Sequence, residues 1–232
     1  MDYRVENKYL VSDKDLTVLQ GRLQSIMSVD SHQPDGCYRI RSLYFDAAWD
    51  RCMEENEAGI DQRQKFRIRI YDPESDVIHL EIKEKSRGLT KKVACSVSRK
   101  ETEDILHGML PLCPDSRKPL NLLKLRARDT LMRPKAIIEY ERTAFVCPSG
   151  NVRITFDRNI MASRCCTDFF RQSVPGMTPV LPTGMHVLEV KYDEYLPDYI
   201  AGVIELGNLQ QTAFSKYYLG RLAVNGEFPI IP

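Results

Sequence analysis

Charged and apolar residues alternate with period two in several segments of this chain, and this alternation most constrains its fold. In residues 65–70, Phe, Ile and Ile alternate with Lys, Arg and Arg. Because successive side chains of a strand point to opposite faces, the segment predicts a strand with one apolar and one cationic face. Residues 4–8, 79–85, 152–157 and 187–191 gather charged side chains on one face in the same way. The pattern indicates a β-rich fold whose apolar strand faces form the core.

Eight segments are predicted as strands because they combine alternation with residues typical of β-sheet. They are residues 4–11, 38–46, 65–71, 77–86, 91–97, 135–145, 152–158 and 185–192. No linker rich in Gly, Ser or Pro divides the chain, so residues 1–232 are expected to form one domain. Strands early and late, with helices between them, favour an antiparallel α+β fold. An eight-stranded β-barrel, closed or nearly closed with helices packed outside, would remove the exposed edges of so many strands.

Capping residues and helical spacing of apolar residues mark the predicted helices. Ser12 and Ser98 each precede an acidic residue by three positions, which is the spacing of a capping box. A third amphipathic stretch covers residues 120–131, and a last helix is predicted at about residues 215–224. The Pro-containing segment 173–184 is long for a connection, so it is expected to be a lid or a disordered tip.

The composition excludes several classes of function. With 33 basic and 32 acidic residues the net charge is +1, so no overall field attracts nucleic acid or a membrane surface. No apolar run approaches the ~20 residues that cross a bilayer, and the charged first residues are unlike a signal peptide. A cytoplasmic location without a transmembrane segment is therefore expected. The seven cysteines are expected to be reduced, and neither they nor the four histidines show metal-site spacing.

The charged strand faces have two interpretations. Solvated faces of antiparallel sheets commonly show the same alternation. If the faces instead point into a barrel, their like charges repel unless an anion or a metal lies between them. Arg offers phosphate oxygens a rigid fork of donors and Lys adds a compact charge, so this second interpretation predicts a phosphate chain as ligand. The chain has neither of the Gly-rich phosphate-binding motifs, so side chains would have to hold the phosphates.

Carboxylates and one helix start complete the predicted site. Glu6, Glu81 and Glu189 are hard oxygen ligands suited to Mg²⁺ or Mn²⁺ that bridges phosphates. Ser215 is a good N-cap for the last helix, where backbone amides can bind a phosphate. Lys216 in the first turn opposes the helix dipole, a mild cost that a bound phosphate would reverse.

Seven short motifs follow one another along the chain. They are Arg-Val-Glu-Asn-Lys-Tyr at 4–9, Ser-Leu-Tyr-Phe-Asp at 42–46, Lys-Phe-Arg-Ile-Arg at 65–69, Glu-Tyr-Glu-Arg-Thr-Ala-Phe at 139–145, Arg-Ile-Thr-Phe-Asp at 153–157, Leu-Glu-Val-Lys-Tyr at 188–192 and Phe-Ser-Lys-Tyr at 214–217. Together they resemble the ordered motif set of the VTC domain, a member of the CYTH-like superfamily of triphosphate tunnel metalloenzymes. The resemblance spans nearly the whole chain, and the serial order is more specific than any single motif.

The resemblance implies an antiparallel tunnel and a metal-dependent polyphosphate polymerase, which transfers the γ-phosphate of ATP to a growing inorganic polyphosphate chain. ATP, polyphosphate and Mn²⁺ or Mg²⁺ are the expected ligands, and no nucleic acid is expected. Glu189 would hold the metal, with Glu6 and Glu81 as further candidates. The implied catalytic and phosphate-binding residues, with Ser215 assisting, are Lys8, Arg67, Arg69, Lys83, Lys92, Arg142, Arg153 and Lys216.

Two positions depart from related sequences. The wider superfamily opens with E-x-E-x-K, and Arg4 replaces the first acid here, which resembles the polymerase branch and disfavours a triphosphatase or cyclase. Ala213 stands where some polymerase relatives have an additional Lys. This difference is expected to affect how tightly the polymer is held and how processive its synthesis is. Two alternatives stay open: a triphosphate or polyphosphate hydrolase on the same fold, and a non-catalytic polyphosphate or nucleotide sensor. A membrane-protein partner for export would be visible in neighbouring genes and not in this chain.

Overall fold

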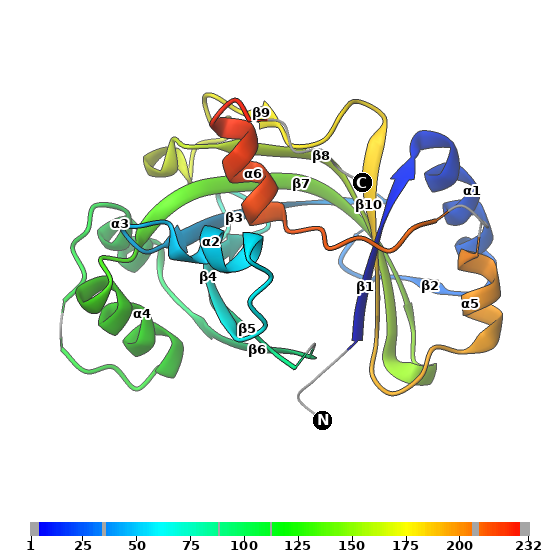
Figure 1. Cartoon of the computed structure of the whole chain (residues 1–232), viewed down its shortest axis with the longest axis horizontal. Coiled ribbons are helices and arrows are strands. Elements are labelled where there is room, and N and C mark those ends of the chain that lie inside the picture. The colour runs from blue at the N-terminus through cyan, green and yellow to red at the C-terminus, as the bar shows by residue number, and fades with distance from the viewer. Residues whose placement is uncertain (1–4, 34–35, 88, 112, 206–208, 228–232) are drawn as a thin grey trace.

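One curled antiparallel sheet organises the molecule (Figure 1). The computed structural model describes residues 5–33, 36–87, 89–111, 113–205 and 209–227, and Arg4 lies outside these ranges. Eight strands follow one path in the order β1-β10-β8-β7-β3-β4-β5-β6, and short β2 and β9 pair with β7 and β8. The strands are β1 (Val5–Ser12), β2 (Ser28–Val29), β3 (Tyr38–Asp46), β4 (Arg63–Ile70), β5 (His79–Ser86), β6 (Leu89–Ser96), β7 (Arg133–Cys147), β8 (Val152–Ser163), β9 (Thr178–Pro179) and β10 (Met185–Tyr192).

Helices lie at both ends of the sheet and across its middle. In Figure 1, α1 and α5 lie together beside β1, α3 and α4 lie at the opposite end, and α6 crosses β7 and β8. Short 3₁₀ turns occupy Ser149–Asn151 and Cys166–Asp168. The helices are α1 (Asp13–Gln24), α2 (Arg51–Glu57), α3 (Arg99–Leu106), α4 (Lys118–Asp129), α5 (Asp198–Ile204) and α6 (Lys216–Val224).

The antiparallel α+β class predicted from the sequence is confirmed, and the sheet has the shape of a half-barrel. Its edge strands β1 and β6 contact each other, yet no backbone pairing joins them in the part of the chain that the structure describes. A side-chain contact spans the gap instead, with Lys83 Nζ of β5 at 2.5 Å from Glu6 Oε2 of β1. The curl therefore brings the inward faces of strands far apart in the sheet order to one place.

Apolar clusters cover the convex face of the sheet. Leu16, Leu19 and Leu23 of α1 pack with α5 against β1, β8 and β10. Ile105 of α3 and Leu123 of α4 share a second cluster with β3, β4 and β5. Both capping boxes predicted at the starts of α1 and α3 are present, so these helices begin where the sequence places them.

Helix α6 differs because it packs on the concave face. Its Tyr217, Leu219 and Leu222 form a cluster with inward residues of β3, β7 and β8. Gly220 permits this close approach, since a Cβ there would lie 2.3 Å from Ile138 Cδ1 of β7. The N-terminal end of α6 is thereby held against the inward strand faces.

The segment 173–184, expected to be a lid or a disordered tip, is neither. Val174, Val180 and Leu181 are buried, and β9 within the segment pairs with β8. The amphipathic stretch predicted for residues 120–131 ends earlier, because α4 stops at Asp129 and Leu131 has a positive φ of 53°. Among the described residues, no helix combines the length and apolar character needed to span a membrane.

Candidate functional site

A cavity of about 690 Å³ lies on the concave face of the sheet, and cationic side chains dominate its wall. This phosphate cavity, as we call it, is bounded by β1, β4, β5, β7, β10 and the start of α6. Among the described residues its carboxylates are Glu6 and Glu189. Its cations are Lys8, Arg63, Lys65, Arg67, Arg69, Lys83, Lys85, Arg142, Lys191 and Lys216. Ten cations against two carboxylates make a site suited to a polyanion.

Period-two alternation and strand register bring these cations together. Lys65, Arg67 and Arg69 share the inward face of β4. Lys65 lies directly opposite Lys83 of β5, and Lys83 lies opposite Lys92 of β6. Like charges in register are unfavourable, so the row indicates a ligand of opposite charge.

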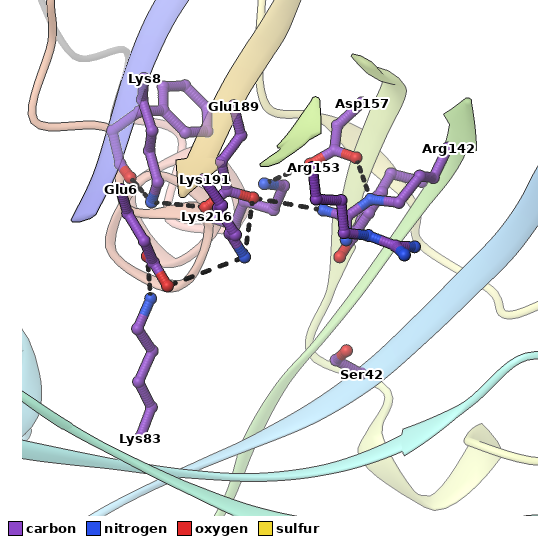
Figure 2. A network of polar contacts seen from close by, with 12 residues as sticks. Glu6, Lys8, Ser42, Lys83, Arg142, Arg153, Asp157, Glu189, Lys191 and Lys216 are labelled. Carbon is purple, nitrogen blue, oxygen red and sulfur yellow. Dashed lines mark hydrogen bonds and ion pairs between the residues drawn. The ribbon is translucent and has the colours of Figure 1, made fainter. Parts of the chain in front are cut away.

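Glu189 is the centre of one ion-pair network, shown in Figure 2. Its carboxylate lies 3.4 Å from Lys191 Nζ, 3.5 Å from an Arg142 Nη and 3.9 Å from Lys8 Nζ. Burial opposes ionisation, but Lys191 and Lys8 outweigh it and hold the pKa of Glu189 well below its usual range. Glu6 joins the network through Lys191 at 3.7 Å and through Lys83.

Asp157 anchors the deepest cations. It is fully buried, accepts two hydrogen bonds from Arg142 at 2.6 and 2.8 Å, and lies 2.6 Å from Lys216 Nζ. Burial would lower the pKa of Lys216, but Asp157 more than compensates, so the pKa is raised. Lys216 therefore stays charged at the start of α6, where Ser215 caps the helix by accepting from the Tyr218 amide.

Arg67 and Arg69 of β4 differ in how firmly they are held. Arg67 Nε donates to Glu81 at 2.7 Å. Arg69 is only 7 % exposed, yet its contacts with the Tyr140 and Ser42 hydroxyls measure 3.4 and 3.5 Å, and Glu81 is 4.0 Å away. A buried guanidinium with such distant partners is costly unless an anion completes its coordination.

Lys65 and Lys83 have lowered pKa values. Burial, with Arg63 as the strongest neighbouring cation, lowers the pKa of Lys65 to about 7. Burial also lowers the pKa of Lys83, to about 8, although Glu6 acts in the opposite direction. Lys65 Nζ donates to Asn56 and Ser215 at 2.7 and 2.8 Å, both uncharged acceptors. The cavity thus holds lysines whose charge an anion would favour.

Two wall carboxylates fit a divalent metal ion that takes its other ligands from phosphates. Glu6 and Glu189 lie on the neighbouring strands β1 and β10 and share Lys191 as a partner. Mg²⁺ is commonly held by one or two carboxylates plus substrate phosphates. In the described ranges, no group of three His, Cys, Asp or Glu could hold a metal.

Three of the site residues predicted from the sequence do not line the cavity. Glu81 lies behind Arg67 and also accepts from Lys92 at 3.2 Å, and Lys92 is half exposed at the margin. Arg153 pairs with Asp30 at 2.5 Å. The remaining predicted residues all contribute to the wall: Glu6, Lys8, Arg67, Arg69, Lys83, Arg142, Glu189, Ser215 and Lys216.

Sequence reasoning left Lys65 and Lys191 out of the candidate site, although both line the cavity. Both lie on charged faces that the alternation had identified, at even spacing from Arg67 and Glu189. Counting every cation on those faces, instead of the motif positions alone, would have included them.

One comparison with known proteins identifies a family. The model of the VTC domain matches residues 3–225. No curated protein sequence matches closely enough to count as a relative. Similar solved structures include the PH1819 protein of Pyrococcus horikoshii OT3, with 13% identity, TM-score 0.48 and coverage of 94% of this chain and 97% of that one.

Two further structures are similar over most of the chain. A putative adenylate cyclase from Bacillus halodurans has 12% identity and a TM-score of 0.47, with 88% of this chain and 87% of that one covered. The Mimivirus capping enzyme triphosphatase has 9% identity and a TM-score of 0.43, with 88% of each chain covered. All these TM-scores lie below 0.5, so the assignment rests on the family match.

Proposed function

Because the chain belongs to the VTC domain family, we propose that it is a metal-dependent polyphosphate polymerase using ATP as phosphoryl donor. The observation that carries this proposal is the charge imbalance of the phosphate cavity, whose cations far outnumber its two carboxylates. The loosely paired, buried Arg69 adds to it. A polyphosphate chain, with a negative charge on every unit, would compensate such a wall.

The transfer needs positioning and charge neutralisation more than covalent chemistry. An oxygen of the terminal phosphate of the growing chain attacks the γ-phosphorus of ATP, the bond from that phosphorus to the bridging oxygen breaks, and ADP leaves. Arg67, Arg69 and Lys216 would hold the phosphates in line and neutralise charge on the transferred group. Glu189 and Glu6 would hold Mn²⁺ or Mg²⁺, and the bound ion would neutralise negative charge on the phosphate oxygens.

The paired state of the carboxylates favours a polymerase over a hydrolase. Hydrolysis requires a water molecule oriented or deprotonated by a base. Glu6 and Glu189 are both engaged by lysines and are the proposed metal ligands, so neither carboxylate is well placed to act as a general base. A terminal phosphate is already anionic and needs no base, so it is the better-matched nucleophile for this cavity.

Product analysis tests the proposal. Purified protein incubated with ATP and Mn²⁺ should yield ADP and long phosphate chains, resolved by gel electrophoresis. Orthophosphate as the only phosphate product would refute the polymerase and identify a hydrolase. Tight, salt-dependent binding of polyphosphate without ATP consumption would identify a sensor instead.

A further inference from the structure

A second cavity lies beside the phosphate cavity and shares two of its cationic residues. It has a volume of about 350 Å³ and lies between α2, α4 and the ends of β4 and β5. We call it the outer groove, lined among others by Arg51, Arg63, Gln64, Lys85 and Arg126. Arg63 and Lys85 line both cavities, so this pair lies where the two spaces adjoin.

Arg63 and Lys85 are like charges in direct register on β4 and β5. Within the described ranges, the Arg63 side chain donates only to the backbone oxygens of Glu55 and Ile60, at 3.4 and 3.3 Å. No ion pair joins Arg63 or Lys85 to a carboxylate among the residues that the structure describes. Like charges placed opposite each other without compensation destabilise a sheet, so their juxtaposition indicates an anion at the junction.

Cationic character continues beyond this junction. Arg126 of α4 is half-buried, and the one polar contact of its side chain within the described ranges is with Gln64 Oε1 at 3.4 Å. Of the two groove carboxylates, Glu55 is paired with Arg51 at 2.7 Å and Glu84 accepts from Gln64 Nε2 at 2.7 Å. The outer groove therefore carries four cations against two engaged carboxylates.

A single row of cations leads from one cavity to the other. Arg69, Arg67, Lys65 and Arg63 occupy alternate positions of β4 and all line the phosphate cavity. Alternate residues of a strand are roughly 7 Å apart, so the row offers a positive charge at regular intervals. An extended polyanion that follows this row out of the phosphate cavity reaches the outer groove.

We propose that the outer groove is an exit site for the anionic polymer, where a phosphate chain longer than the phosphate cavity binds after passing Arg63 and Lys85. The identity of the polymer rests on the proposed function. A phosphate chain is favoured over an acidic peptide because the groove adjoins the phosphate cavity and shares two of its cations.

Length-dependent binding tests the exit site. The full chain is titrated with sodium tripolyphosphate and with long-chain inorganic polyphosphate at about 0.1 M salt. Arg126→Gln should weaken long-chain binding about three- to tenfold and leave tripolyphosphate binding unchanged. Arg128→Gln, two residues further along α4 and exposed, removes the same charge outside both cavities and should change neither.

Three outcomes would overturn the exit site: unchanged long-chain binding in Arg126→Gln, an equal loss for both phosphate ligands, or an equal loss for a poly-glutamate peptide. The product assay separates this inference from the proposed function. If ATP yields no polymer, the polymerase is refuted while the binding comparison still decides the groove. If polymer forms, Arg126→Gln should shorten it, and unchanged product length would speak against an exit site.

Discussion

Arg69 provides the sharpest test of the phosphate cavity at the scale of one residue. If the proposed phosphate transfer takes place in this cavity, Arg69→Gln should lower ADP release from ATP about 100-fold or more, because it removes a preorganised donor to the transferred phosphate. Its native contacts are long, so thermal unfolding should change little or shift upward. Activity is measured by coupled detection of ADP and folding by circular dichroism. Arg128→Gln is the matched control, and activity retained in Arg69→Gln would contradict the assigned role.

The lowered pKa of Lys65 predicts that anion binding depends on pH. A bound phosphate chain would raise the pKa of Lys65 above its free value of about 7. Below that pH Lys65 is already charged and affinity is at its highest; above it, binding must take up a proton and affinity falls. The fall approaches tenfold per pH unit for one proton.

Tripolyphosphate affinity measured from pH 6 to 9 checks this. Lys65→Arg, which keeps the charge at every pH, should remove the part of the fall that begins near pH 7. The fall due to Lys83, whose pKa is about 8, should remain. Titration of tripolyphosphate itself affects the native chain and Lys65→Arg equally. Identical plots of affinity against pH for these two proteins would therefore show that Lys65 does not take up a proton on binding.

How far single residues could be predicted depended on strand parity. Alternation places Lys8, Arg67 and Glu189 on charged strand faces, the resemblance implies that these faces point inward, and the structure puts all three residues on the cavity wall. Parity cannot tell where along a strand the cavity ends. Arg153 lies outside the cavity wall because it pairs with Asp30. Asp30 lies in a loop, and no sequence pattern connects that loop to β8, so this pairing could not be predicted.

Among the structural elements, the segment 169–172 is fixed to the sheet by one buried arginine. Arg41 of β3 is 1 % exposed and donates to the carbonyls of Phe169, Arg171 and Gln172 and to Glu139. Arg41→Met removes the buried donor to these acceptors, so it should cost about 3 kcal/mol of unfolding free energy, measured by urea denaturation.

Arg39 is the matched control, two residues away on the same strand. Its side chain is 50% exposed and lies 4.0 Å from the same Glu139, so Arg39→Met should change stability by less than about 0.5 kcal/mol. Equal losses in the two variants would mean that the buried network contributes nothing beyond a surface charge.

Short elements were the least predictable part of the fold. Helix α2 has no side-chain cap of its own, because Asp50 at its start makes no capping bond. Asp46 at the end of β3 takes that role, accepting from the amides of Ala47, Cys52 and Met53. Tyr217 of α6 also donates to Asp46 at 2.6 Å, so a tertiary contact defines this helix start. Capping from a residue outside the helix leaves no local signal in the sequence.

At the scale of the whole molecule, the net charge is close to zero, but positive charge is concentrated in one place. The chain has a net charge of +1, yet ten cations gather around one cavity. Their repulsion opposes the curl, and the edge strands β1 and β6 lack backbone pairing in the described ranges. Lys83 and Glu6 connect the two sides of the opening through a side-chain contact. The curled state is therefore the one that an anion should stabilise.

Tripolyphosphate should accordingly raise the unfolding temperature of the whole chain. At about 100 times its dissociation constant, a ligand of the native state adds about 2.7 kcal/mol, which corresponds to about 5–10 °C for a chain of this size. Sulfate at equal ionic strength is the control, since it screens charges but cannot follow a row of cations. The Arg69→Gln variant should show a smaller shift with tripolyphosphate and the same response to sulfate. If sulfate shifted the native chain as much as tripolyphosphate, general screening would explain the stabilisation, and the cavity would have no preference for linked phosphates.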